Sequence, residues 1–324
     1  MRARQVMFWL AAAAVVGGLS AGVAIAGKPP AGGGGTGGGT IYFQHSGSFW
    51  KMNSDGSGKT QLAAGGEPSH QLHGGQRWFL GFAEVGGTHP DGSAVWEIVA
   101  VGEDAQVTVQ LTSDANLKFE GFPRWGKDDS FFSASCVDWS GGSPVSRLVQ
   151  VALTFDGSGG SVAAGTPAAV LTNSQVQTGG NGEVFSTILN HDWSPDAGKV
   201  VWTDRSSGSV VLRVTTVAGG ATTTLAAGGW PAWSNDGATI AYNGPNGVES
   251  ITPAGANHKT LVRNGKSGSY GRPDWSPTDS HVVYWRSGST FPYTSDVGRV
   301  TSGGSDKTEL TTDVSAPAIP FGWR

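Results

Sequence analysis

The sequence predicts an all-β protein, a six-bladed β-propeller with four antiparallel strands in each blade. Three observations support this fold class. From residue 40 onward, short β-forming runs alternate with segments rich in Gly, Asp, Asn, Ser and Pro, which is typical of all-β folds. A two-part sequence unit recurs along the chain, and repeats with four short strands form propeller blades. The two ends of the chain each carry part of one further repeat.

The first part of the repeat consists of a Pro or Asp, a Trp, a polar turn and an apolar strand that ends in an aromatic residue. Its clearest copies cover residues 192–202, 231–242 and 273–284, with a weaker copy at 123–132 and a degenerate one at 68–79. The Asp, Asn and Gly residues of the polar segment favour tight turns. Each copy therefore predicts two antiparallel strands joined by a turn.

The second part of the repeat lies downstream of each first part. Residues 52–62 align without gaps with residues 251–261 and 300–310, and looser copies end at Leu111, Leu171 and Leu225. Each copy predicts a strand, a Gly-dependent hairpin turn and another strand. The repeats then begin near residues 68, 123, 192, 231 and 273, and each supplies four strands.

The two chain ends predict how the ring closes. Residues 320–324 begin another first part, and the sequence stops just after Trp323. The missing continuation is at the other end, because residues 39–43 are similar to residues 238–242. We expect the C-terminal strand to join three N-terminal strands, at about 40–64, in one shared blade. Such a blade removes the exposed sheet edges and brings the number of blades to six.

The repeated residues resemble the TolB-like propeller repeat, a WD-repeat-like unit written as P-x-W-S-P-D-G-x-x-I-x-Y. Residues 52–62 are similar to the second half of that unit. The resemblance covers residues 40–324 and implies a TolB-like propeller that serves as a docking surface. The α/β domain that precedes the propeller in the TolB pattern has no counterpart in this sequence. A fold of this kind hosts many functions, so the site decides the function.

Composition narrows the class of partner. Only 14% of the residues are charged, and the formal net charge is −4. A mildly acidic chain without basic clusters is a poor partner for phosphate backbones, so we expect no nucleic-acid binding. The single cysteine, Cys136, excludes an intramolecular disulfide. We expect it to be a small buried apolar side chain, with a reactive thiol as the alternative.

The N-terminal segment predicts export. Arg2 and Arg4 precede an apolar stretch from Val6 that ends in Ala24-Ile-Ala26, the pattern of a signal peptide at residues 1–26. The apolar stretch is also about long enough for an uncleaved membrane anchor. Residues 27–39 are a Gly-rich linker. The expected product is a monomer in the periplasm or outside the cell, with no membrane insertion after cleavage.

The loops of the predicted ring supply the candidate binding residues. The repeated Trp residues at 125, 193, 233, 275 and 323 are expected to pack between blades, whereas Trp230 lies outside the repeat position. The loops before each first strand, and those between the second and third strands, share the face around the channel mouth. The longest are 85–95, 136–146 and 286–297, and long loops on a rigid scaffold commonly bind ligands. The predicted binding residues are His45, Glu67, His70, His191, Arg205, Trp230, Arg272 and Arg286.

Motifs for catalysis are few. Glu67-x-x-His70-x-x-His73 is the best candidate for a metal site, and His45 and His191 could join it. A strand would, however, send His70 and His73 to opposite faces. The sequence contains no G-x-S-x-G motif for a nucleophilic serine. No cofactor is predicted.

Two functional hypotheses follow. The first is a non-enzymatic binding scaffold that recognises a protein or a glycan through the loops around the channel mouth. The second is a metal-assisted polysaccharide lyase or hydrolase that uses a histidine group at the same mouth.

Overall fold

The computed structural model describes residues 38–158, 160–265, 268–288, 295–311 and 318–324. The predicted signal peptide (1–26) and all of the predicted linker except its last two residues lie outside these ranges. In the described residues the chain forms 27 strands and no helix. No helix long and apolar enough to cross a membrane is therefore present in that part of the chain.

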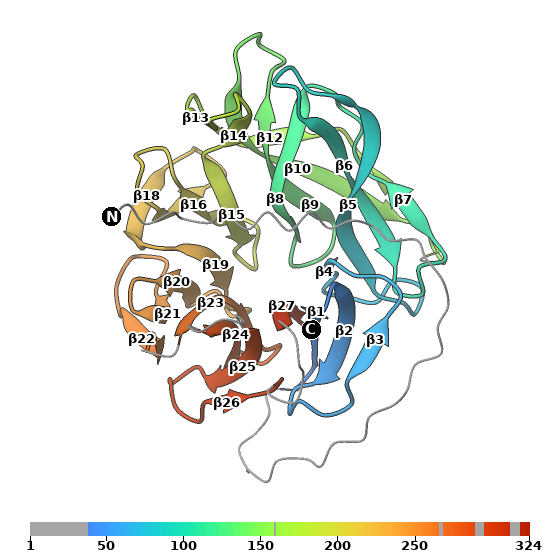
Figure 1. The fold of residues 1–324 in the computed structure, drawn as a ribbon. Coiled ribbons are helices and arrows are strands. Elements are labelled where there is room, and N and C mark those ends of the chain that lie inside the picture. Colours follow the sequence, from blue (N-terminus) through green and yellow to red (C-terminus); the bar gives the residue numbers. More distant parts are fainter. Residues whose placement is uncertain (1–37, 159, 266–267, 289–294, 312–317) are drawn as a thin grey trace.

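The strands form six sheets that radiate from a common axis, with an extra hairpin at the rim (Figure 1). We number them as blades in chain order. Blade 1 contains β27 (Ala318–Trp323), β1 (Thr40–His45), β2 (Ser48–Asn53) and β3 (Thr60–Leu62). Blade 2 contains β4 (Glu67–Pro68), β5 (Trp78–Thr88), β6 (Ala94–Gly102) and β7 (Thr108–Gln110).

Blade 3 contains β8 (Leu117–Trp125), β9 (Phe131–Asp138), β10 (Val145–Phe155), β11 (Val162–Ala164) and β12 (Ala168–Asn173). The extra hairpin consists of β13 (Val176–Thr178) and β14 (Val184–Ser186). Blade 4 contains β15 (Ile188–Trp193), β16 (Lys199–Asp204), β17 (Val211–Thr216) and β18 (Thr222–Ala227).

Blade 5 contains β19 (Gly229–Trp233), β20 (Ile240–Gly244), β21 (Gly247–Ile251) and β22 (Lys259–Arg263). Blade 6 contains β23 (Gly268–Trp275), β24 (His281–Gly288), β25 (Ser295–Thr301) and β26 (Thr308–Glu309). All neighbouring strands within a blade are antiparallel, for example β16 with β17 and β24 with β25. The predicted fold class, a six-bladed propeller, is confirmed.

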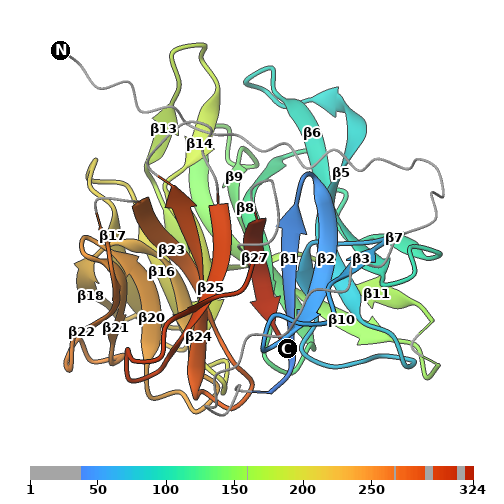
Figure 2. The same ribbon diagram turned by 60° about the horizontal axis from the view of Figure 1, so that its bottom comes forward.

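The predicted shared blade is also confirmed. Strand β27 pairs with β1, with Ile41 opposite Trp323. The pairing continues past the strand ends, because the N–H of Arg324 donates to the carbonyl of Thr40 at 2.9 Å. The first and last strands of the described chain therefore lie side by side, and β1 is paired on both sides, with β2 and with β27 (Figure 2).

Blade 3 departs from the prediction of four strands per blade. The long strand β10 pairs with β12 along its first half and with β11 along its second half. The outer strand of this blade is therefore divided into two segments. The β13–β14 hairpin then follows before blade 4 begins (Figure 1).

The repeated Trp residues pack between blades, as predicted. Trp125 and Trp275 donate from Nε1 to backbone carbonyls of the inner strand of the preceding blade, those of Glu67 (2.8 Å) and Ala232 (3.0 Å). Trp193 reaches the Ser133 hydroxyl of the preceding blade at 2.7 Å. All five Trp side chains are buried. They supply large apolar surfaces, and the indole N–H groups of Trp233 and Trp323 donate within their own blades, to the carbonyls of Gly237 and Gly38.

Cys136 lies in β9 and is fully buried. Burial raises the pKa of its thiol, which keeps it protonated and unreactive at neutral pH. The expectation of a buried apolar side chain is confirmed.

Ring closure gives a test of the fold. Trp323 is 1% exposed and packs in one cluster with Ile41 of blade 1 and Val283 of blade 6. We expect Trp323→Ala to lower the free energy of unfolding by about 3–5 kcal/mol, because it leaves a large cavity at the closure. Urea denaturation of the full chain measures this value.

The matched control is Leu72→Ala, since Leu72 is 56% exposed. Its effect should stay within about 0.5 kcal/mol. Equal losses in the two variants would contradict the role given to Trp323 in ring closure.

Candidate functional site

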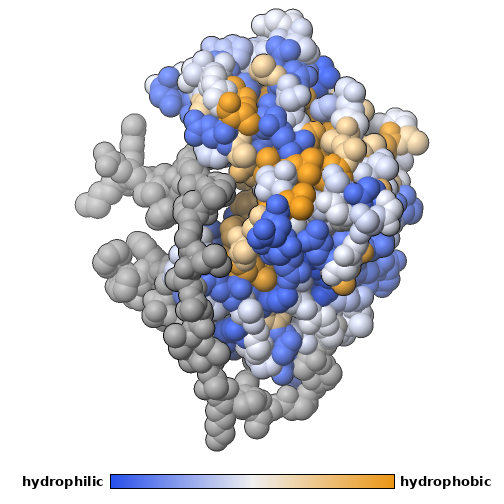
Figure 3. Space-filling view, turned by 90° about the vertical axis from the view of Figure 1, so that its right-hand side faces the viewer, coloured by the Kyte–Doolittle hydropathy of each residue, from blue (hydrophilic) through white to orange (hydrophobic). Residues whose placement is uncertain are grey.

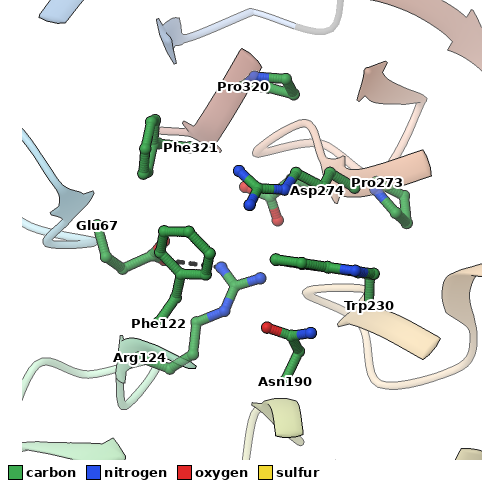
Figure 4. Close-up of a pocket in the computed structure, with 10 residues that line it drawn as sticks. Glu67, Phe122, Arg124, Asn190, Trp230, Pro273, Asp274, Pro320 and Phe321 are labelled. Carbon is green, nitrogen blue, oxygen red and sulfur yellow. Dashed lines mark hydrogen bonds and ion pairs between the residues drawn. The ribbon is translucent and has the colours of Figure 1, made fainter. Parts of the chain in front are cut away.

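The six inner strands surround a cavity on the propeller axis (Figure 4). Its volume is about 460 Å³, including the part that is open to solvent. The lining residues are Glu67, Phe122, Arg124, Asn190, Trp230, Arg272, Pro273, Asp274, Pro320 and Phe321. Each of β4, β8, β15, β19, β23 and β27 contributes at least one of them.

One repeat position supplies most of the lining. The residues three positions before each repeated Trp are Phe122, Asn190, Trp230, Arg272 and Pro320. In the degenerate copy of blade 2, Glu67 lies three positions before His70, which stands where the other copies have Trp. The repeat therefore places six chemically different side chains in one layer around the axis.

A strand irregularity accompanies this position. In four blades the pairing between the first and second strands shifts register across the lining residue: at 120–124, 188–191, 229–232 and 271–274. A β-bulge leaves the extra residue out of the ladder and redirects its side chain. The bulges explain why these residues point to the axis while the Trp three positions later points between blades.

Two of the bulged residues have strained backbones. Trp230 has a φ of 53° and Arg272 a φ of 48°, the left-handed region that bulky residues rarely adopt. Such a conformation costs about 1–3 kcal/mol per residue and persists only where the surroundings enforce it. Both strained side chains line the cavity.

Aromatic rings hold the Arg272 guanidinium in place. Its Cζ lies 4.1 Å from the ring centroid of Trp230 and 4.6 Å from that of Phe122. These two rings are 5.5 Å apart, and Phe122 also contacts Phe321 at 5.7 Å. The rings form a wedge around the cation, a cation–π arrangement that gains strength as water is excluded. Burial, with a smaller effect of Arg124, lowers the pKa of Arg272 to about 10, so it remains positive at neutral pH.

A network of buried ion pairs forms the other part of the lining. Glu67 Oε1 accepts from Arg124 Nη1 at 2.9 Å and from Arg324 Nη2 at 2.7 Å. Arg324 Nη1 also donates to Asp274 Oδ2 at 2.9 Å. Burial raises the pKa of Glu67, and the two guanidinium groups oppose that effect. The network joins blades 1, 2, 3 and 6 at the axis.

One further cation of the cavity, Arg272, lies outside this network and has no carboxylate partner in it. The cations at the axis are Arg124, Arg272 and Arg324, and the carboxylates are Glu67 and Asp274, which leaves one positive charge in excess. Within the described part of the chain, no carboxylate lies within ion-pair distance of Arg272. The nearby Lys127 does not add to the excess, because it pairs with Asp192 at 3.1 Å.

Three predicted binding residues meet in this cavity: Glu67, Trp230 and Arg272. The other five do not line it. His45 ends β1 with its ring against Trp50. Arg205 follows β16, and Arg286 lies in β24 at 3.8 Å from Asp296.

His191 and His70 are tied into the structure elsewhere. His191 lies in β15 rather than in a loop, is 1% exposed, and its Nε2 is 2.7 Å from the Ser133 hydroxyl. Burial lowers the pKa of His191 to about 3, so the ring is neutral at pH 7. The backbone N–H of His70 donates to Asp129 Oδ1 at 2.8 Å. Burial also lowers the pKa of the His70 ring well below its usual value.

The Glu67-x-x-His70-x-x-His73 motif does not come together. His73 Nε2 lies 3.1 Å from Asp129 Oδ2, and its ring stacks on Phe155. Glu67 instead faces two arginines. In the residues that the structure describes, no three His, Cys, Asp or Glu side chains are placed to hold a metal ion.

Sequence reasoning missed seven of the ten residues that line the cavity. The residues not singled out are Phe122, Arg124, Asn190, Asp274 and Phe321, together with the prolines at 273 and 320. A signal was present, because an alignment of the repeat copies shows that the position three before the Trp varies from blade to blade.

The predicted long loops include two hairpin turns that rise above the ring (Figure 2). Segment 85–95 forms the tip of the β5–β6 hairpin and 136–146 that of β9–β10. They contact each other through stacked rings of His89 and Trp139, with centroids 5.7 Å apart. Lys118 fixes the β13–β14 hairpin beside them, with ion pairs to Asp91 (3.1 Å) and Glu183 (2.9 Å). Of 286–297, residues 289–294 lie outside the described residues.

A second hollow lies at the rim, between β7 and β11. It is lined by residues 109–115 and 162–167, among which only Asp114 is charged. The side of the molecule that carries β7 shows polar residues with apolar ones among them (Figure 3). The axial cavity, with its converging charges and aromatic rings, is the better candidate site.

Comparison with known proteins supports the fold. No family model matches the sequence, and no curated protein matches it. TolB from Acinetobacter baumannii is similar in structure, with a TM-score of 0.58 and 15% identity over 90% of this chain and 67% of that chain. A protein assigned as TolB from Agrobacterium tumefaciens has a TM-score of 0.50 and 16% identity, over 73% of this chain and 81% of that chain.

A chain of the nidogen/laminin complex is similar as well, with a TM-score of 0.51 and 10% identity over 88% of this chain and 97% of that chain. Identities this low establish a shared fold and not a shared function. The chain therefore has the TolB-type β-propeller fold.

The buried His191 predicts a specific pH dependence. Its pKa is about 3 in the folded state, against about 6.5 in an unfolded chain. The unfolded state then binds the extra proton between these values, so folding stability falls as the pH falls from 6.5 toward 3. His191 lowers the free energy of unfolding by up to about 1.4 kcal/mol for each pH unit of acidification in this range. We expect His191→Asn to lack this contribution.

Urea denaturation of both proteins at pH 7.5, 6.5, 5.5 and 4.5 measures the effect. His191→Asn should be the less stable protein at pH 7.5, and the difference should narrow with acidification. A constant difference across the series would show that His191 is not held neutral by burial.

Proposed function

We propose that this chain is an exported, non-enzymatic binding scaffold that recognises its partner through the axial cavity and the loops around it. The observation that carries this proposal is the wedge of Phe122, Trp230 and Arg272, built from two strained residues in a cavity on the axis. Residues in such strained conformations cluster at ligand sites, where the surrounding structure holds them in place. Aromatic and Arg side chains are also the residue types that dominate binding energy at interfaces.

A protein partner fits this cavity better than a glycan. Sugar rings stack on open aromatic faces, but the Trp230 face is occupied by the Arg272 guanidinium at 4.1 Å. An extended polypeptide can instead place one side chain or its terminus in a narrow axial cavity while its flanks contact the surrounding loops. The nidogen/laminin complex provides an example of this fold within a protein–protein assembly.

Export rests on the N-terminal sequence. Residues 1–26 carry the basic start, apolar middle and small-residue end of a secretory signal peptide. A lone buried cysteine is compatible with an oxidising compartment, because it cannot form a disulfide within the chain. The partner is then a protein of the cell envelope or of the medium.

Site-specific crosslinking tests the proposed binding face. We expect a photoreactive phenylalanine analogue at Asn190, which lines the cavity, to crosslink one defined protein in the source cells. The same analogue at Val217, an exposed residue directly after β17, should not crosslink that protein. Crosslinking to the same protein from both positions, or from Val217 alone, would contradict binding at the cavity.

The crosslinked partner, once purified, allows affinity to be measured by calorimetry. We expect Phe122→Ala and Trp230→Ala each to weaken binding by about tenfold or more, as loss of a central aromatic anchor does. Val217→Ala is the control and should leave the affinity unchanged. Recovery of a polysaccharide instead of a protein at position 190 would favour the glycan form of the scaffold.

Signal-peptide processing is tested by mass. We expect the exported protein to begin at Gly27, so that its intact mass equals that of residues 27–324. Ala24→Asp with Ala26→Asp should block cleavage, since the peptidase requires small residues there. A full-length chain that stays in the membrane fraction of the wild type would indicate an uncleaved anchor.

A further inference from the structure

We propose that Arg272 binds a single carboxylate of the partner polypeptide, either an Asp or Glu side chain or the C-terminal carboxylate. This inference rests on the proposed function, and it assigns the chemistry that the axial cavity recognises. It depends on three features of the cavity. Arg272 has no carboxylate partner among the described residues, aromatic rings hold its guanidinium, and the excess of positive charge is one.

The charge balance calls for an anion. Glu67 and Asp274 together balance Arg124 and Arg324, because Glu67 pairs with both arginines and Asp274 pairs with Arg324. Arg272 has aromatic neighbours but, among the described residues, no carboxylate within ion-pair distance. A half-buried cation without a counterion is costly, and an anion that enters the cavity removes that cost.

The way in which Arg272 is held suits a carboxylate. The Phe122 and Trp230 rings lie next to the guanidinium, with their centroids 4.6 Å and 4.1 Å from its Cζ, and restrict its orientation before any ligand arrives. Aromatic rings take up no hydrogen-bond donors in the guanidinium plane. Those donors form the planar fork that pairs with the two oxygens of a carboxylate. Pre-organisation of this kind reduces the entropy lost on binding.

The excess of one charge favours a monoanion. A phosphomonoester carries a charge of about −1.5 to −2 at neutral pH. Glu67 and Asp274 line the same cavity and would repel the second negative charge of such a group. A carboxylate, with one charge, restores neutrality without this repulsion.

Short capped peptides test the inference without knowledge of the partner. The protein is labelled with 5-fluorotryptophan, and the fluorine signal of Trp230 is assigned by its absence from Trp230→Phe. The probes are acetyl-Gly-Glu-Gly-amide, acetyl-Gly-Gln-Gly-amide, acetyl-Gly-Gln-Gly with a free C-terminus, and the phosphoserine analogue acetyl-Gly-pSer-Gly-amide. We expect saturable shifts of the Trp230 signal with the carboxylate probes and at least about tenfold weaker binding of the fully amidated Gln peptide.

The two carboxylate probes distinguish the source of the anion. Tighter binding of the Glu peptide indicates an acidic side chain, and tighter binding of the free C-terminus indicates a chain end. Equal shifts with the Glu peptide and its amidated Gln counterpart would overturn the inference. Preference for the phosphoserine peptide would do the same, because it contradicts the argument from charge balance.

Three variants test whether the carboxylate probes bind at Arg272. Arg272→Gln should weaken the binding of the carboxylate probes by about tenfold or more, and Arg272→Lys by a smaller factor, because Lys keeps the charge but lacks the fork. Arg263→Gln, an equal charge change at an exposed residue of β22, should have no effect. Thermal melts confirm that each variant is folded, and Arg272→Lys alone decides the test if Arg272→Gln does not fold. Unchanged probe affinity in the folded Arg272 variants would overturn the inference.

The failures of the two proposals can be told apart. If position 190 crosslinks a protein whose affinity is unchanged by Arg272→Gln, the scaffold proposal stands and the carboxylate inference fails. If the peptides bind as expected but position 190 crosslinks no protein, the carboxylate site stands and protein recognition fails.

Discussion

The pairing of β27 with β1 is the constraint on which the rest of the structure depends. It joins the two ends of the described chain in one blade and covers the edge of β1 that would otherwise be unpaired. The same pairing brings Arg324 to the axis, where its guanidinium contacts Glu67 of blade 2 and Asp274 of blade 6. Ring closure and the ion pairs of the cavity therefore depend on the same strand pairing. A chain that failed to close would lose its edge protection and one of the cations of the site together.

Within each repeat, stability and recognition are assigned to different positions. The Trp at the end of the inner strand points between blades and is buried in all five copies that carry it. The residue three positions earlier points to the axis, and the register shift beside it keeps it out of the sheet ladder in four blades. Because a bulged residue has no fixed cross-strand partner, its identity can change without loss of sheet pairing. The ring therefore tolerates six different residues at this layer, and those residues can be selected for binding.

The fold could be predicted from the sequence because its signals are local and repeated. The turn residues, the Trp positions and the matching chain ends each require only short-range pattern recognition. The cavity could be predicted only in part. Trp230 and Arg272 could be predicted because they deviate from the repeat or precede it. Phe122 and Asn190 depend on bulges that shift side-chain direction, and variation at their repeat position does not by itself show that they face the axis. His191 illustrates the same difficulty, because its neighbour Asp192 pairs with Lys127 near the axis while the His191 ring is buried against blade 3. The divided outer strand of blade 3 lies in a stretch where the repeat is only loosely kept, so the prediction of four strands failed there.

The ion pairs at the axis orient the side chains of the cavity, in addition to any effect on stability. The free-energy cost of removing charges from water is about as large as the gain from pairing them. Well-packed apolar side chains at the axis could therefore hold the six blades together equally well. What charged groups add is direction, because each guanidinium and carboxylate fixes the orientation of its partners. In this ring Glu67 orients Arg124 and Arg324, while the aromatic rings of Phe122 and Trp230 orient Arg272. One cation is thus held by groups that do not neutralise it, in a chain whose overall charge is negative. An uncompensated positive charge at the centre of an acidic protein concentrates its attraction for anions at one point, and that point is the axial cavity.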